Sequence, residues 1–96
     1  MPKRHTFACV NKERHPYNTA VAAELRGYLS AADKTQQELA DATGLSLQTI
    51  GRLLRGERDI DVAVIALMAD FLNFEPQELL VRASARLARE SRDLAQ

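Results

Sequence analysis

Gln48 and Arg52 are the two side chains of this 96-residue sequence best suited to form specific hydrogen bonds with another molecule. A glutamine amide can form two hydrogen bonds with an adenine edge, and an arginine guanidinium can form two with a guanine edge. The two residues are four positions apart, so in a helix they project from one face. Arg55 and Arg58 follow closely and could bind phosphate groups beside such bases. This group of residues favours a surface that binds double-stranded DNA.

Two short helical segments joined by a tight turn are predicted to position these side chains. The first segment begins at Thr35, and Glu38 completes a Thr-x-x-Glu capping box. Gly44 ends this segment and can adopt the positive φ that a sharp turn needs. The second segment is predicted to begin with Ser46 as its N-cap and to close at Gly56.

Apolar residues in the two segments are spaced so that they converge between the helices. These residues are Leu39, Leu45, Ile50 and Leu53. Ala40 is small where the second helix must pass close to the first. The pattern therefore predicts a helix-turn-helix. The alternative is an ordinary helical hairpin, but such a hairpin does not need a glutamine and several arginines gathered on its outer face.

Three further helices are predicted from apolar residues that recur with a period of 3.6, and no stretch alternates as a strand would. The first of these helices is predicted to begin with Asn18 as its N-cap and to run to about Ala32. The other two run from Asp61 to Asn73 and from Pro76 towards the end of the sequence. The sequence therefore predicts an all-α fold, a compact bundle of five helices.

The predicted helix at residues 61–73 is apolar on two faces. Its expected core stripe is Val62, Ile65, Met68, Ala69 and Leu72. A second stripe at i, i+3 and i+7 consists of Val64, Leu67 and Phe71. Because a helix this apolar is normally covered, the second stripe is a candidate interface. The last helix could cover it, but we favour the N-terminal segment, through Phe7 and Val10, or a second subunit.

The chain is predicted to have three parts, and its charge is unevenly distributed although its thirteen basic and thirteen acidic residues cancel. Residues 1–17 are expected to form a basic arm, residues 18–81 the DNA-binding domain, and residues 82–96 an extension of the fifth helix. The arm could contact phosphates or a minor groove, or it could simply be solvated. Its candidate contacts are Lys3, Arg4, Lys12 and Arg14.

The last predicted helix is longer than a compact domain requires. Arg82, Arg86 and Arg89 form one basic stripe. A narrow apolar stripe consists of Leu80, Ala83, Leu87 and Leu94. Three interpretations remain open: a solvated helix, a coiled-coil-like dimer seam, and a connector to a further segment.

Several function classes are excluded by what the sequence lacks. His5, Cys9 and His15 offer three zinc ligands with no fourth Cys or His, so we expect no metal site. A single cysteine cannot form an intramolecular disulfide. Carboxylate pairs, a P-loop and nucleophile motifs are absent, so we expect no enzyme, no catalytic residue, no cofactor and no small-molecule ligand. Because no apolar run approaches the roughly 20 residues of a membrane span, we expect a cytoplasmic protein with no membrane partner. Since we expect it to bind DNA, we expect it at the nucleoid of a bacterial host cell.

Two stretches of the chain carry a resemblance to a known family. TQQELADATGLSLQTIGRLLRG at residues 35–56 and DVAVIALMADFLNFEPQELL at residues 61–80 resemble the lambda-repressor and Cro-type helix-turn-helix proteins, the XRE family. The resemblance implies a lambda-repressor-like bundle of about five helices whose third helix enters the major groove of DNA. Members are usually transcriptional repressors or regulators, and they commonly bind palindromic operators as dimers.

The resemblance assigns site residues position by position. The base-reading face falls on Ser46, Leu47, Gln48, Gly51 and Arg52. The phosphate-binding face falls on Lys34, Thr35, Gln36, Thr49, Arg55 and Arg58. Gly51 lies inside the predicted recognition helix, where glycine costs about 1 kcal/mol relative to alanine. Two interpretations of Gly51 stay open: close approach to DNA, or a tolerated exposed glycine.

These observations predict a protein that binds a double-stranded DNA operator sequence-specifically and represses transcription by occupancy, as a phage or prophage immunity repressor does. A homodimer is a further expectation. Two alternatives share the same hairpin. One is an antitoxin-type regulator, and the other is a module that binds another protein through Val64, Leu67 and Phe71.

Overall fold

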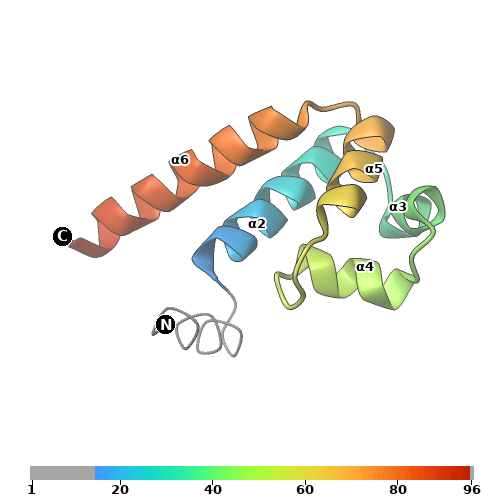
Figure 1. The fold of residues 1–96 in the computed structure, drawn as a ribbon, viewed down its shortest axis with the longest axis horizontal. Helices are drawn as coiled ribbons and strands as arrows, with labels where there is room; N and C mark the ends of the chain where they lie inside the picture. The colour runs from blue at the N-terminus through green and yellow to red at the C-terminus, as the bar shows by residue number, and fades with distance from the viewer. Residues whose placement is uncertain (1–14, 96) are drawn as a thin grey trace, which may run out of the picture.

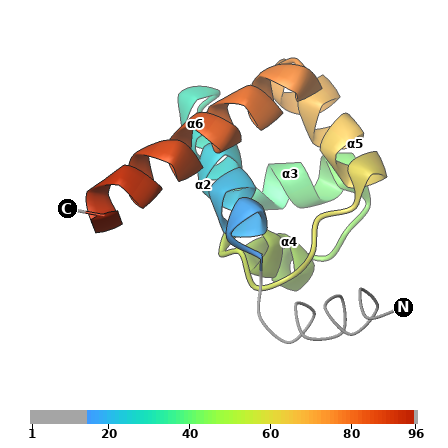
Figure 2. The ribbon, with the colours of Figure 1, turned by 60° about the vertical axis from the view of Figure 1, so that its left-hand side comes forward.

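The computed structural model describes residues 15–95, which form five helices and no strand. The helices are α2 (Pro16–Ala31), α3 (Gln36–Thr43), α4 (Leu47–Leu54), α5 (Val62–Leu72) and α6 (Pro76–Ala95). The prediction of an all-α bundle is confirmed. Figure 1 shows α6 beside α2, with α3 and α4 at the other side of the molecule and α5 between them. Figure 2 shows α6 crossing α2.

α2 begins three residues earlier than its sequence predicts. His15 is the N-cap, and its Nδ1 accepts a hydrogen bond of 3.0 Å from the backbone N–H of Tyr17. Pro16 fits the first turn because a helix leaves that N–H unbonded in any case. The prediction of Asn18 as the cap is therefore wrong. The Asn18 side chain instead donates to the backbone oxygen of Arg58 at 3.1 Å.

The helix-turn-helix forms from the local signals in its sequence. Thr35 Oγ1 accepts from the backbone N–H of Glu38 at 3.0 Å, and the Glu38 carboxylate accepts from that of Thr35 at 2.8 Å. These two bonds confirm the capping box. Gly44 ends α3 with φ +78°, as predicted for the turn. Ser46 then caps α4, and Gly56 follows that helix with φ +77°.

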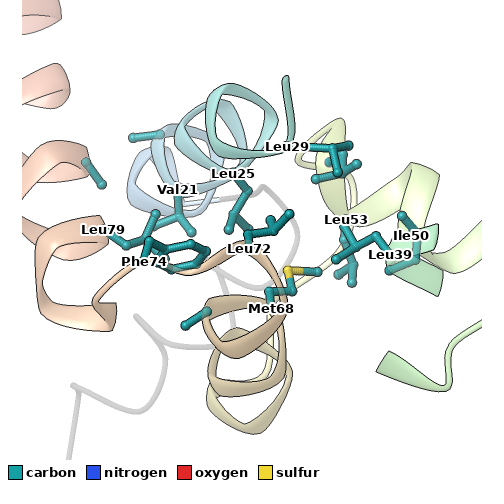
Figure 3. Close-up of a cluster of buried hydrophobic side chains, with 14 of the residues drawn as sticks. Val21, Leu25, Leu29, Leu39, Ile50, Leu53, Met68, Leu72, Phe74 and Leu79 are labelled. Carbon is teal, nitrogen blue, oxygen red and sulfur yellow. The ribbon is translucent and has the colours of Figure 1, made fainter. Parts of the chain in front are cut away.

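The core lies where α2, α3, α4 and α5 converge, and α6 covers it at the end opposite α3 and α4 (Figure 3). Its largest fully buried side chains are Leu25, Leu39, Ile50, Leu54, Met68 and Leu79. Full burial of such a side chain contributes about 1.5–3 kcal/mol. Leu53 and Ala40 are buried as predicted between the two short helices. This core fixes α4 by its inner face and leaves its outer face to solvent.

The predicted core stripe of α5 is correct only over part of the helix. Met68, Ala69 and Leu72 are buried, and Ile65 is half-buried against the core. Val62 is 78% exposed, so its assignment to the core is wrong. It occupies the first helical position, one turn beyond the packed part of α5.

Polar contacts join α2 to α6. The Tyr17 hydroxyl contacts Ser84 Oγ and donates to the backbone oxygen of Leu80 at 3.0 Å. Glu24, whose side chain is 11% exposed, accepts from Arg86 at 2.8 Å and from Arg82 at 3.3 Å. Burial raises the pKa of Glu24, but the hydrogen bonds and charges of the two arginines outweigh this and hold it below its ordinary value. Two members of the predicted basic stripe are therefore paired within the fold.

Candidate nucleic-acid interface

The outer face of α4 presents the side chains that are best suited by type to contact bases. Gln48 and Arg52 are exposed, and Leu47 is 47% exposed. Ile50 and Leu53, on the opposite face of the same helix, are buried in the core. One side of α4 thus holds the helix in place, while the other offers an amide, a guanidinium and an apolar tip to solvent.

Ser46 and Thr49 belong to the start of α4 and already bond to each other. Ser46 Oγ accepts from the backbone N–H of Thr49 at 3.1 Å. The Ser46 hydroxyl also donates to Thr49 Oγ1 at 2.9 Å. Ser46 therefore stabilises the end of the helix. Its predicted part in base reading, and that of Thr49 in phosphate binding, remain predictions.

Arg55 is held by an acid that the sequence analysis did not select. Its Nε and Nη2 donate to the carboxylate of Glu57 at 3.0 and 3.3 Å. This pairing, through the hydrogen bond first and the charge second, raises the pKa of Arg55 and lowers that of Glu57. Both side chains stay more than half exposed, so Arg55 remains accessible to a phosphate. The only sequence signal was the acid two positions after the arginine, across Gly56.

Gly51 is buried, so its interpretation as an exposed glycine is wrong. A Cβ built on it would lie 3.1 Å from Arg55 Nη1 and 3.8 Å from Gln36 Oε1. The side chains of Arg55 and Gln36, both predicted to bind phosphate, thus each lie near this glycine. The assignment of Gly51 to base reading remains a prediction.

The start of α3 adds exposed polar groups beside α4. Thr35 and Gln36 are exposed, and the helix that they begin leaves its first backbone N–H groups without a helical partner. Lys34 is exposed as well, but its ammonium lies 5.4 Å from the centre of the Phe71 ring on α5. Arg58, in the loop after α4, is exposed.

Two residues of α2 that were not predicted to belong to the site hold the end of α4 and the loop after it. Arg26 Nη1 on α2 donates to the backbone oxygen of Leu54, the last residue of α4. Asn18 holds the backbone of Arg58 in the same way. Both contacts join positions far apart in the sequence, so no local pattern indicates them. Together with the core, they set the direction in which α4 presents its outer face.

The three candidate interface residues of α5 are not equivalent. Val64 and Phe71 are half-buried and pack against the core, whereas Leu67 is 46% exposed. A hollow beside Leu67 is bounded by Ala63, Ala66, Asp70 and the turn into α6. The chain's own core therefore covers part of the predicted stripe.

Several predictions concern residues outside the described range. These are the arm residues Lys3, Arg4, Lys12 and Arg14, and the rejected zinc ligands His5 and Cys9. Between residues 15 and 95, no group of His, Cys, Asp or Glu side chains is placed to hold a metal ion. Within the same range, none of the helices combines the length and apolar character needed to cross a membrane.

Comparison with known proteins identifies the class of this bundle. A family model described as helix-turn-helix matches residues 24–79, which is more than half of the chain. The chain therefore belongs to the helix-turn-helix family, of the XRE type, and is a DNA-binding transcription regulator and not an enzyme. The resemblance found in residues 35–56 and 61–80 is thereby confirmed.

Solved structures of regulators share the fold. The clp gene regulator ClgR from Corynebacterium glutamicum is 25% identical, with a TM-score of 0.78 over 86% of this chain and 90% of that chain. The restriction-modification controller protein C.AhdI from Aeromonas hydrophila is 31% identical, with a TM-score of 0.60 over 64% of this chain and 92% of that chain. A search of curated proteins found no match.

Proposed function

We propose that this protein is a sequence-specific repressor that inserts α4 into the major groove of an operator and blocks transcription by occupancy. One observation carries the proposal: the outer face of α4 is free of core contacts and bears Gln48, Arg52 and Leu47. The likeness to ClgR, named as a gene regulator, and to C.AhdI, named as a controller protein, supports it. A phage or prophage immunity repressor is the biological role that we infer.

Three side chains of α4 would read bases in this arrangement. Gln48 would pair with adenine and Arg52 with guanine, because each offers two hydrogen-bonding groups in a plane. Leu47 would contact a thymine methyl group. Each bidentate contact discriminates against a wrong base by about 1–3 kcal/mol. The wild-type protein should therefore prefer one oligonucleotide sequence over its single-base variants.

Phosphate contacts would set the affinity and the register. Arg55 and Arg58 flank the end of α4, and Thr35 and Gln36 stand at the start of α3 beside it. Each phosphate that a side chain neutralises lowers the logarithm of the binding constant by about 0.9 per tenfold rise in salt. In a homodimer, two copies of α4 would address half-sites about 34 Å apart. The basic residues of the arm, residues 1–17, would add further phosphate contacts.

A pair of arginine substitutions tests the division of roles. Bound sites are first selected from a random pool of duplex DNA, and the symmetry of the selected sequence reports whether two copies bind. Arg52→Ala should flatten the base preference at one position and weaken binding. Arg55→Ala should weaken all sequences about equally and reduce the salt slope by about 0.9.

The control for both variants is Arg92→Ala on the exposed part of α6, which should leave the affinity and the slope unchanged. Equal, uniform losses for Arg52→Ala and Arg55→Ala would refute the assignment of a base reader and a phosphate contact. Failure of the wild-type protein to select any sequence would refute the proposed function itself.

A further inference from the structure

Gly51 lies at the fifth of the eight positions of α4, where a glycine weakens the helix. Gly51 needs no positive φ, unlike Gly44 and Gly56. Its backbone conformation therefore gives no reason for a glycine. The space above it does, because the nearest atom to a built Cβ is Arg55 Nη1 at 3.1 Å. This separation is tighter than ordinary van der Waals contact, so an alanine would require the guanidinium to shift by a few tenths of an ångström.

The Arg55 guanidinium is bonded along one edge, and its other edge lies near Gly51. Glu57 accepts from Nε at 3.0 Å and from Nη2 at 3.3 Å, which uses one edge of the planar group. Nη1, on the other edge, lies against Gly51. The guanidinium is thus held across the end of α4, although more than half of the side chain remains exposed.

Gln36 also lies near the open space above Gly51. Its Oε1 lies 3.8 Å from the position of the Gly51 Cβ, so a side chain from α3 and one from the end of α4 share the space that this glycine leaves open. Both residues belong to the proposed phosphate-binding face. A larger residue at position 51 would meet these two flexible side chains first, because they contribute the nearest atoms.

We propose that Gly51 is a positioning residue: its missing Cβ lets the Arg55 guanidinium, held at its other edge by Glu57, lie over α4 beside Gln36 and meet a DNA phosphate there. This inference rests on the proposed function and assigns Gly51 a role other than base reading. It also explains why a helix-weakening residue occupies the middle of α4. The protein gives up helix stability to keep one arginine in place.

Two properties of Gly51→Ala should change in opposite directions. Thermal stability should rise because alanine favours the helix and the displaced guanidinium can move into solvent. Affinity for the selected DNA should fall about fivefold because one charge-assisted hydrogen bond to phosphate is misplaced. Gly27→Ala is the matched control, since a Cβ there meets nothing within 4 Å. It should raise stability and leave DNA affinity unchanged.

A double-mutant cycle separates action through Arg55 from a direct effect on DNA. In an Arg55→Ala background, Gly51→Ala should change affinity less than about 1.5-fold, because the group that it displaces is gone. A fivefold loss in both backgrounds would mean that the new methyl group meets DNA itself, and would overturn the proposal. An unchanged affinity in the wild-type background would overturn it as well.

A measurement without DNA distinguishes failure of this inference from failure of the proposed function. In the free wild-type protein, nuclear Overhauser effects should be observed between the Gly51 α-protons and the Arg55 side-chain N–H groups. In Gly51→Ala, the effects between the α-proton of residue 51 and these N–H groups should be weaker. Absence of these effects in the wild-type protein refutes the position of Arg55 over Gly51, whatever the DNA result. If the effects are present and the protein binds no DNA, the proposed function fails, and with it the phosphate-binding role assigned to Arg55.

Discussion

Replacement of Gly44 by alanine tests whether the turn between α3 and α4 depends on a left-handed backbone conformation. Gly44 has φ +78°, and a Cβ built on it meets nothing within 4 Å. The substitution therefore adds no steric contact with another residue. Its whole effect on stability must come from the backbone, because an L-residue in this region costs about 1–2 kcal/mol.

Gly27→Ala supplies the comparison with the opposite sign. Gly27 lies inside α2, and a Cβ there also meets nothing within 4 Å. In a helix interior, alanine is more favourable than glycine by about 1 kcal/mol. The same chemical change should thus destabilise the protein at position 44 and stabilise it at position 27. The two free energies of unfolding should differ by about 2–3 kcal/mol.

Urea unfolding followed by circular dichroism measures this difference. The midpoints should move in opposite directions while the slope m stays constant, since the surface exposed on unfolding is nearly unchanged. Thermal midpoints should shift by about 4–8 °C for each kcal/mol. If both variants move the midpoint the same way, backbone conformation does not decide the stability of the turn, and our account of it is refuted.

Two ionisable residues give further tests. Because the pKa of Glu24 lies below its ordinary value of 4.5, its stabilisation is complete above that value and is lost as the pH falls through the lower pKa of the folded state. Glu24→Gln should lower the free energy of unfolding by about 1–2 kcal/mol at neutral pH, and in acid its urea midpoint should approach that of the wild-type protein. A difference between the two midpoints that stays constant with pH would contradict the pairing with Arg86 and Arg82. Tyr28 has a pKa raised above 10.0, by burial first and by its hydrogen bond to Glu78 second. The stabilisation that these contacts of the Tyr28 hydroxyl provide is present below pH 10.0 and is lost as the pH rises through the higher folded-state pKa. In a variant lacking the other tyrosine, phenolate absorbance should therefore rise with a midpoint above 10.0. A midpoint at or below that value would refute the raised pKa.

Local signals in the sequence were sufficient to predict the helix-turn-helix. The capping box at Thr35, the turn at Gly44 and the cap at Ser46 each act within a few residues, so their types and spacing determine the result. The start of α2 was misplaced because Asn18 is a better cap by residue type, while the chain uses His15 one turn earlier. Val62 was misplaced because periodicity does not indicate where a helix extends past the core.

The residue types of the site were predictable, but their arrangement was not. The outward position of Gln48 and Arg52 follows from the helical period. The burial of Gly51 under Arg55 depends on the direction of a long side chain, which Glu57 fixes across a turn. The position of Lys34 over Phe71 depends on packing between α3 and α5, which no local pattern encodes.

The geometry of α6 has a practical consequence for binding measurements. Figures 1 and 2 both show the C-terminal end of α6 well separated from α4. A biotin or a fluorescent group attached after this helix therefore stands away from the outer face of α4. Molecules immobilised through that end on a sensor surface would present α4 to the solution, so affinities measured in this orientation should agree with those measured without a support.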